Sequence, residues 1–248
     1  MPRKSKQLLS VIIPAYLQEK TIVSDLKQVS QVLEKIRYNW EIIVVVDGCV
    51  DKTYQNARKV ATAKIKVFKF KTNHGKGYAV RFGMKKAKGD YILFLDSGME
   101  IDPNGISMLL EHLEWYDADI IVGSKRHPVS VVNYPLERVI LSAGYYWMVR
   151  ILFGINIKDT QPGIKIFRRS VLTKVLPLLQ VKRYAFDIEM LSVAHKLGFT
   201  RIFEAPIKLD FQYASLTNAS TLKAIWGMFW DTLRVFYRLK ILDFYGKT

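Results

Sequence analysis

The sequence predicts an α/β fold in which helices cover both faces of one doubly wound sheet. With 248 residues, the chain is long enough to bury a core as a single domain. Half of its residues are hydrophobic, and no low-complexity tract interrupts them, as is typical of a folded globular chain. Along the first half, short apolar runs alternate with helical patterns, and this alternation favours strands joined by helical crossovers.

The strands of this sheet are predicted from apolar runs. Several of the runs are hydrophobic throughout, which is expected when helices cover both faces of a sheet. The first run follows a basic N-terminus but is interrupted by Pro14, so we expect a strand there and not a signal peptide. The predicted strands are Leu8–Ile13, Trp40–Val46, Ile65–Phe70, Tyr91–Leu95 and Asp119–Val122.

Helices are predicted between and after these strands. Apolar residues repeat at helical spacing over Ile22–Ile36, and Thr21 is suited to cap that helix. From about Pro135 helical patterns dominate, with a loop at Lys158–Gly163 and a final helix over Thr221–Leu239. No linker rich in Pro, Gly or Ser separates the two halves, so we expect one domain.

The net charge of +16 is the strongest compositional signal. Basic chains commonly meet nucleic acid, anionic lipid headgroups or phosphorylated substrates, although such charge can also serve solubility alone. Near the C-terminus Trp and Tyr are mixed with Lys and Arg, which suits a lipid interface better than a nucleic-acid backbone. The longest uncharged apolar stretch, Val139–Val149, is far shorter than the roughly 20 residues that span a bilayer. We therefore expect the protein to lie on a membrane surface without crossing it.

The single cysteine, Cys49, excludes an internal disulfide and favours a reducing compartment. We therefore expect a cytoplasmic protein, peripheral on the cytoplasmic face of a membrane.

Acidic residues follow two of the predicted strands. Asp47 and Asp96 each end an apolar run, at the strand ends where open α/β sheets bind their ligands. An acid at such a place can bind a ribose hydroxyl or a base edge, and it can equally cap the next helix. Glu19, after the first strand, has the same two interpretations.

The turn Asn73–Gly77 is glycine-rich and opens a helix. Its glycines let backbone amides approach a phosphate, and Lys76 adds a positive charge. The spacing is not that of a P-loop, because no Ser or Thr follows the lysine. After Asp96, the acids Glu100 and Asp102 follow closely, and Mg²⁺ or Mn²⁺ is held by one or two carboxylates together with substrate phosphates. Capping of the next helix accounts better for Asp102 than for Asp96.

In this order, the motifs resemble those of family 2 glycosyltransferases with the GT-A fold, and particularly the polyprenyl- and dolichyl-phosphate sugar synthases. The resemblance extends over Leu8–Lys223. It implies a mixed sheet with C-terminal helices at the membrane interface, and a Mg²⁺ or Mn²⁺ ion held by Asp96 with help from Glu100. The residues that it places on the nucleotide-sugar are Pro14, Tyr16, Glu19, Asp47, Lys76, Asp96 and Gly98.

The second half adds an acceptor signature. Asp159–Lys165 resembles the family's Asp-Thr-Gln-x-Gly-x-Lys loop, in the form most like dolichyl-phosphate glucose synthases, and the resemblance places Lys165 on the donor phosphate. Asp187 lies in Phe186–Glu189, which resembles the acidic helix start near the acceptor, although Asp187 is also a plausible N-cap. The residues implied to hold the acceptor phosphate are Lys125, Arg126, Arg138, Ser142 and Gln161.

Two departures from the family pattern stand out. Its Asp-x-Asp motif is here Asp96-Ser97-Gly98, so the second carboxylate is missing. The Arg and the Gly-x-Ser-Lys that precede its last helix are replaced by Phe211–Asn218, which contains no cation. A catalytically inactive membrane-binding relative is therefore one alternative.

The resulting hypothesis is an inverting, metal-dependent transfer of a hexose from UDP-glucose or GDP-mannose to a polyprenyl phosphate at an anionic membrane surface. We expect residues 1–123 to bind the nucleotide-sugar, 124–220 the acceptor, and 221–248 the membrane, with no role for nucleic acid and with room for a membrane-protein partner. Asp96, Lys165 and Asp187 are the predicted catalytic residues. A second alternative is transfer to a sugar or protein hydroxyl, for which Asp187 is the best candidate base.

Overall fold

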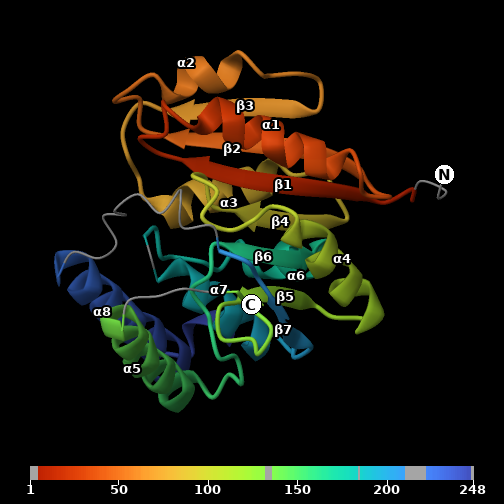
Figure 1. The fold of residues 1–248 in the computed structure, drawn as a ribbon. Coiled ribbons are helices and arrows are strands. Elements are labelled where there is room, and N and C mark those ends of the chain that lie inside the picture. Colours follow the sequence, from red (N-terminus) through yellow and green to blue (C-terminus); the bar gives the residue numbers. More distant parts are fainter. Residues whose placement is uncertain (1–4, 132–135, 184, 210–221, 247–248) are drawn as a thin grey trace.

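The computed structural model describes residues 5–131, 136–183, 185–209 and 222–246, with the backbone alone described for 136–141 and 222–225. In this part of the chain, seven strands form one sheet in the order β3-β2-β1-β4-β6-β5-β7 (Figure 1). The strands are β1 (Leu8–Ala15), β2 (Asn39–Asp47), β3 (Ile65–Phe70), β4 (Tyr91–Leu95), β5 (Ile120–Ser124), β6 (Ile164–Arg168) and β7 (Ile202–Pro206).

The sheet is mixed because β6 runs antiparallel to both of its neighbours, whereas the other adjacent pairs are parallel. β6 lies between β4 and β5, with Lys165 opposite Phe94 on one side and Val122 on the other. The five predicted strands are present, and β6 and β7 are additional. The predicted loop at 158–163 leads directly into β6.

Helices cover both faces of the sheet, and alternate residues of each strand point to opposite faces. In β1, Ile12 packs with α3 and α7, whereas Val11 and Ile13 pack with α1 and α4 on the other side. The described helices are α1 (Ile22–Leu33), α2 (Thr53–Arg58), α3 (Lys76–Lys86), α4 (Gly105–Trp115), α5 (Leu136–Phe153), α6 (Arg169–Val175), α7 (Phe186–Lys196) and α8 (Leu222–Phe236).

The first helix begins where the sequence predicts, but Thr21 does not cap it through its side chain. The Thr21 hydroxyl instead donates to Gln18 Oε1 at 2.8 Å. The Thr21 backbone has a φ of −113° and a ψ of −24°, outside the extended conformation usual for a capping residue.

α5 and α8 lie side by side at one end of the molecule, apart from the helices that cover the centre of the sheet (Figure 1). The Tyr145 and Thr232 hydroxyls are 3.2 Å apart, and the Phe153 and Phe236 rings meet edge to face. After α8 the chain continues as a π-helical segment, Tyr237–Ile241, and a short 3-10 turn, Phe244–Gly246. None of the described helices combines the length and the apolar character needed to cross a bilayer.

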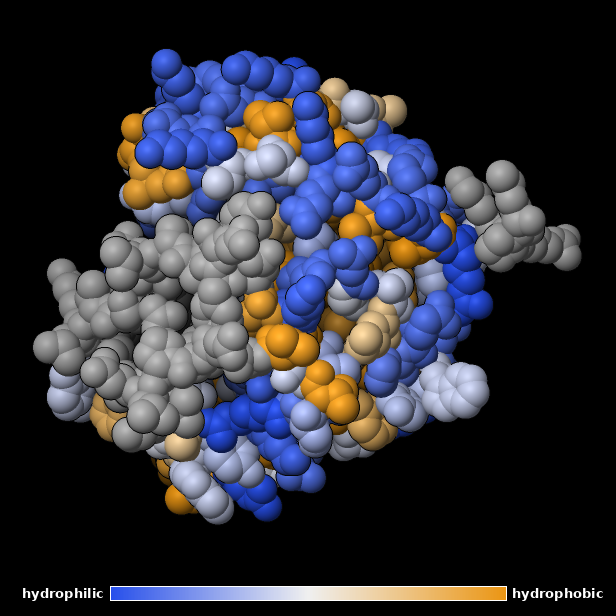
Figure 2. Space-filling model, in the orientation of Figure 1, coloured by the Kyte–Doolittle hydropathy of each residue, from blue (hydrophilic) through white to orange (hydrophobic). Residues whose placement is uncertain are grey.

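The exposed surface reflects the basic, charge-rich composition. On the face drawn in Figure 2, hydrophilic side chains predominate over the upper part of the molecule, and hydrophobic side chains appear in separate patches.

Candidate active site

Three strands deliver the predicted site residues to one edge of the sheet. β2 ends at Asp47, β4 ends one residue before Asp96, and β5 ends at Ser124, just before Lys125. These strands run in the same direction, so their carboxyl ends share one edge, where open α/β sheets bind ligands.

Asp47 organises the glycine-rich turn. Its Oδ1 accepts the His74 amide hydrogen at 2.8 Å, and its Oδ2 accepts the Gly75 amide hydrogen at 2.7 Å. The Asn73 side-chain amide donates to the Asp47 carbonyl at 3.1 Å. Both carboxylate oxygens therefore hold protein amides, and Asp47 fixes the turn that presents Lys76.

Lys76 and Asp96 form an ion pair at this edge, with Lys76 Nζ 2.7 Å from Asp96 Oδ2. The Asp96 amide donates to the Gly163 carbonyl at 2.8 Å. A Cβ on residue 163 would collide with the Asp96 carboxylate, so only glycine allows this approach. The loop before β6 and the end of β4 thus fix Asp96 together, while its carboxylate stays partly exposed.

A divalent metal fits this site only as an ion shared with substrate. Among the described residues, no group of three His, Cys, Asp or Glu side chains could hold a metal. Asp96 is a single, partly exposed carboxylate that already faces a cation, the Lys76 ammonium. Such a ligand suits Mg²⁺ or Mn²⁺ that completes its coordination with substrate phosphates and water, provided that Lys76 exchanges partners.

The predicted second ligand, Glu100, and the departure at Gly98 lie in the turn that follows Asp96. The Gly98 amide donates to Asp25 Oδ2 at 3.1 Å. Asp25 is a buried residue of α1, and burial raises the pKa of its carboxyl group above 3.8, although the hydrogen bond from Gly98 lowers it. Asp25 thus anchors the turn after Asp96 from the buried side. Asp25 is not among the site residues predicted from the sequence. The signal that could have identified it is an acid on the apolar side of α1.

Lys165 and Asp187 form a second ion pair, which is fully enclosed. Lys165 Nζ is 2.5 Å from Asp187 Oδ1 and donates to the Pro162 carbonyl at 2.7 Å. Burial lowers the pKa of Lys165 and raises that of Asp187, while their mutual attraction opposes both shifts. In this structure Lys165 contacts Asp187 and the Pro162 carbonyl. Its contact with donor phosphate, implied by the resemblance, stays a prediction.

Asp187 is also not an N-cap in the expected sense. Ala185 occupies the N-cap position of α7, and Asp187 lies inside the first turn, pointing at Lys165.

The predicted acceptor residues lie around the end of β5. Arg126 donates to the Ser142 hydroxyl at 2.9 Å, and its guanidinium group lies 5.2 Å from the centre of the Tyr146 ring. The Lys125 amide donates to Asp159 Oδ2 at 3.1 Å. The structure therefore brings Arg126 and Ser142 together; Arg138 lies in α5, and its side chain is outside the described residues.

Gln161 connects this region to α5. Its side-chain amide donates to the Tyr145 hydroxyl at 3.2 Å, and its backbone amide lies 3.4 Å from Asp159 Oδ1. Burial raises the pKa of Tyr145, so the phenol stays protonated and available for hydrogen bonds. Gln161 therefore faces protein neighbours in this arrangement.

The predicted nucleoside contacts are divided between exposed and buried positions. Pro14 lies buried in β1, opposite Val45, whereas Tyr16 is exposed just beyond the end of that strand. Glu19 accepts the Lys52 amide hydrogen at 3.1 Å and thereby supports the start of α2. Tyr16 is thus the one of the three best placed to contact a ligand.

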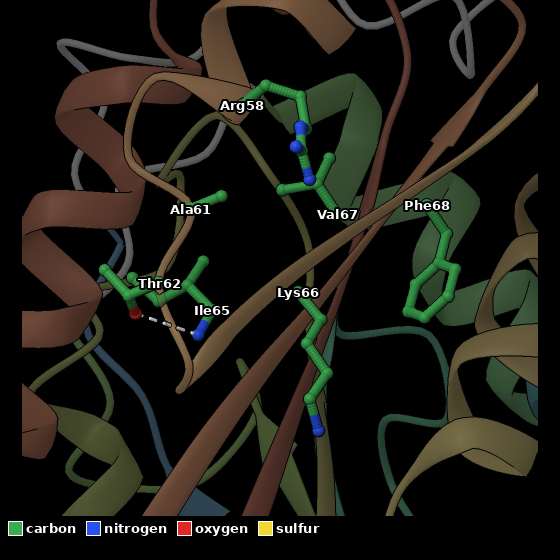
Figure 3. A pocket seen from close by; sticks show the side chains of 7 residues that line it. All are labelled: Arg58, Ala61, Thr62, Ile65, Lys66, Val67 and Phe68. Carbon is green, nitrogen blue, oxygen red and sulfur yellow. Dashed lines mark hydrogen bonds between the residues drawn. The ribbon is translucent and has the colours of Figure 1, made fainter.

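A separate hollow of about 410 Å³ lies at the edge of the sheet, near the start of β3 (Figure 3). It contains no acid and none of the predicted site residues, and it lies toward the amino end of β3, away from Asp47. It is lined by Arg58, Ala61, Thr62, Ile65, Lys66, Val67 and Phe68.

The sequence is similar to known glycosyltransferases. Residues 10–176 match the model of glycosyl transferase family 2. A dolichyl-phosphate beta-glucosyltransferase from Drosophila melanogaster is 35% identical over 205 residues, which are 76% of this chain and 63% of the relative. The enzyme of that name from Homo sapiens is 30% identical over 80% of this chain and 64% of its own length. The chain thus spans somewhat less than two thirds of these relatives.

The fold is also similar to solved structures. Glucosyl-3-phosphoglycerate synthase from Mycobacterium tuberculosis, crystallised with Mn²⁺, UDP and phosphoglyceric acid, matches with a TM-score of 0.70 and 18% identity. The match covers 94% of this chain and 78% of that one. The predicted α/β class and GT-A fold are thereby confirmed. By the match over most of its length, this chain belongs to glycosyl transferase family 2.

Proposed function

We propose that this chain transfers glucose from UDP-glucose to a polyprenyl phosphate, with inversion at the sugar carbon. The relatives named dolichyl-phosphate beta-glucosyltransferase support both the sugar and the acceptor class. Solved structures of the same fold, crystallised with UDP-glucose and Mn²⁺, support the donor and the metal. GDP-mannose is the alternative donor left by the sequence.

The observation that carries the proposal is the register across β6. Phe94, Lys165 and Val122 lie side by side on β4, β6 and β5. Two residues beyond Phe94 lies Asp96, paired with Lys76, and beyond Val122 the chain leads to Arg126, paired with Ser142. A donor diphosphate at the first pair and an acceptor phosphate at the second would then meet at one sheet edge.

The chemistry follows from the acceptor. A phosphate monoester has a second pKa near 6, so its oxygen is largely ionised at neutral pH and needs no strong base. That oxygen forms a bond to the sugar carbon, while the bond from this carbon to the diphosphate breaks and UDP leaves with the electron pair. Arg126, with Lys125, orients the acceptor phosphate, and Lys76 balances the charge of the departing diphosphate.

The remaining groups position these side chains. A divalent ion at Asp96, when bound, would neutralise diphosphate charge. Asp47 and Gly163 hold Lys76 and Asp96 in place through backbone contacts. The Lys165–Asp187 pair supports the site from the protein interior, since neither side chain reaches solvent. The alternative hydroxyl acceptor, which needs Asp187 as a base, is less consistent with this burial.

We place the protein on the cytoplasmic surface of an anionic membrane, held by α5 and α8. Trp226 and Trp230 of α8 are 60% and 56% exposed, and Trp147 and Ile151 of α5 are 58% and 77% exposed. Each pair is spaced by four residues and so lies on one side of its helix. Large exposed aromatic side chains beside basic residues suit the headgroup region.

Incubation of the protein with UDP-glucose, polyprenyl phosphate and Mn²⁺ tests this function. We expect a glucosyl-phosphoryl lipid, detectable by mass spectrometry, and no product from the corresponding polyprenol, which lacks the phosphate. GDP-mannose in place of UDP-glucose tests the donor. Arg126→Ala should raise the KM for the lipid phosphate and leave UDP affinity nearly unchanged. Transfer to polyprenol or to a free sugar, with none to the phosphate, would contradict the proposal.

A further inference from the structure

Glu189 is a buried acid at the centre of a second set of contacts, away from the reacting groups. It lies on α7 with no exposed surface. Its Oε1 accepts the Gln180 amide hydrogen at 2.9 Å and the Tyr245 hydroxyl hydrogen at 2.6 Å, and its Oε2 accepts the Val181 amide hydrogen at 2.8 Å. One carboxylate thus binds both the loop before α7 and the C-terminal segment, which is the chain from Tyr237 to Gly246 after α8.

The loop that Glu189 holds packs directly against the glycine-rich turn. The Lys182 carbonyl accepts the Tyr78 amide hydrogen at 3.0 Å. Gly75 has a φ of +102°, and a Cβ on it would lie 2.5 Å from the same carbonyl. Loop and turn therefore pack together without room for a side chain between them.

The glycine-rich turn also carries the groups that are proposed to face the donor. Asp47 accepts its His74 and Gly75 amide hydrogens, and Lys76 reaches Asp96. From Tyr245 to Asp96, each step is a hydrogen bond, an ion pair or a close packing contact, although the two residues are far apart in the sequence.

We infer that Glu189 and Tyr245 are positioning residues, which set the turn Asn73–Tyr78 and thereby couple donor affinity to docking of the C-terminal segment. The coupling to donor rests on the proposed function, whereas the effect on the turn does not. The segment also carries the exposed side chains of Ile241 and Phe244. Any event that lifts this segment from α7 should loosen the turn.

The physical basis is the cost of removing a donor from a buried carboxylate. A buried acid that loses one of its hydrogen bonds is left undersatisfied, and its remaining contacts rearrange. Tyr245→Phe removes the hydroxyl alone, because the ring itself packs in the core and is kept. Glu189→Gln is a second variant, in which the amide group can still accept but must also place two donors.

Hydrogen–deuterium exchange of the protein without ligand tests the coupling. In Tyr245→Phe, the amides of residues 75–78 and 180–183 should exchange about two- to thirtyfold faster, the usual range for coupling through packed contacts. The Kd for UDP, measured by calorimetry, should rise by a similar factor. Glu189→Gln should change the same amides in the same direction.

Tyr91→Phe is the matched control. The Tyr91 hydroxyl also donates to a carboxylate, that of Glu114, and Tyr91 is likewise buried, but it lies at the start of β4, away from the site. It should lower the Tm without changing exchange at residues 75–78 or the Kd for UDP.

Four outcomes decide the inference and the proposed donor. Unchanged exchange at 75–78 in Tyr245→Phe would overturn it, and so would an equal increase in Tyr91→Phe, which would indicate general destabilisation. Faster exchange at 75–78, confined to Tyr245→Phe and Glu189→Gln, would support it. If that exchange changes but wild-type protein binds no UDP, the positioning of the turn stands and the proposed donor is wrong.

Discussion

Lys165 and Asp187 form an ion pair inside the protein, with Nζ 2.5 Å from Oδ1 and both side chains closed off from solvent. The pair links β6 to the first turn of α7. Lys165 Nζ also lies 4.9 Å from the centre of the Phe94 ring of β4. Burial lowers the pKa of Lys165 and raises that of Asp187, and the attraction between the two groups opposes both shifts.

Breaking this pair should therefore destabilise the fold. Lys165→Met should lower the free energy of unfolding by about 3–5 kcal/mol, because it leaves Asp187 without its partner in the interior. The double variant Lys165→Met with Asp187→Leu should recover much of the loss, as measured by urea unfolding. Losses that simply add in the double variant would show that the two residues do not depend on each other.

Lys76 should compete with metal for Asp96. In Lys76→Met the Asp96 carboxylate loses its cation, so the affinity for Mn²⁺ at saturating UDP should rise by about two- to fivefold, as for a partly exposed ion pair. The affinity for UDP should fall, because a charge facing the diphosphate is lost. Calorimetry measures both.

Two controls accompany that variant. Lys85→Met removes one charge from the exposed side of the same helix and should change neither affinity. Asp96→Asn should abolish Mn²⁺ binding and turnover while the Tm stays close to that of the wild type. Full turnover of Asp96→Asn in the presence of EDTA would falsify the metal role of Asp96.

Asp25 should make stability fall with rising pH. Its pKa is raised in the folded protein, so the folded state binds this proton more tightly than the unfolded chain does. The stabilisation is complete below the unfolded pKa of about 3.8 and is lost as the pH rises through the folded pKa. Asp25→Asn can still accept the Gly98 amide hydrogen but cannot ionise.

The difference in unfolding free energy between Asp25→Asn and wild type should consequently grow in favour of the variant as the pH rises from about 4 to about 7. Urea unfolding at several pH values measures it. A difference that is constant with pH would mean that Asp25 titrates alike in the folded and unfolded states.

Replacing Trp226 and Trp230 together with Ser should release the protein from anionic vesicles without lowering the Tm, because both rings are largely exposed. Each nearby Lys or Arg contributes on the order of 1 kcal/mol on an anionic surface, and salt weakens that share. Binding of the wild-type protein to vesicles should therefore weaken as ionic strength rises, but the contribution of the two tryptophans should remain. The variant should lack this remaining binding, as measured by vesicle flotation.

Trp115→Ser is the control for this variant, since Trp115 is the more exposed tryptophan and lies on α4. It should leave vesicle binding unchanged. A Tm that falls in the double variant, with vesicle binding intact, would assign Trp226 and Trp230 to packing and remove α8 from the membrane surface.

The sequence alone determined the elements whose signal is local. Hydrophobic runs define β1 to β5, helical spacing defines α1, and acids at strand ends mark Asp47 and Asp96. These predictions succeed because side-chain period and strand-end chemistry are properties of neighbouring residues. The order of the motifs indicated the family, and the resemblance to that family supplied the candidate residues of the second half.

The tertiary structure decided what those residues contact. β6 is a short apolar run whose place between β4 and β5 depends on long-range pairing, and that place encloses Lys165 against Asp187. Asp25 reaches the Gly98 amide only because α1 packs over the end of β4. The helical pattern places Asp25 on the apolar side of α1, but its partner and that of Lys165 come from residues distant in sequence, so no local pattern specifies these contacts.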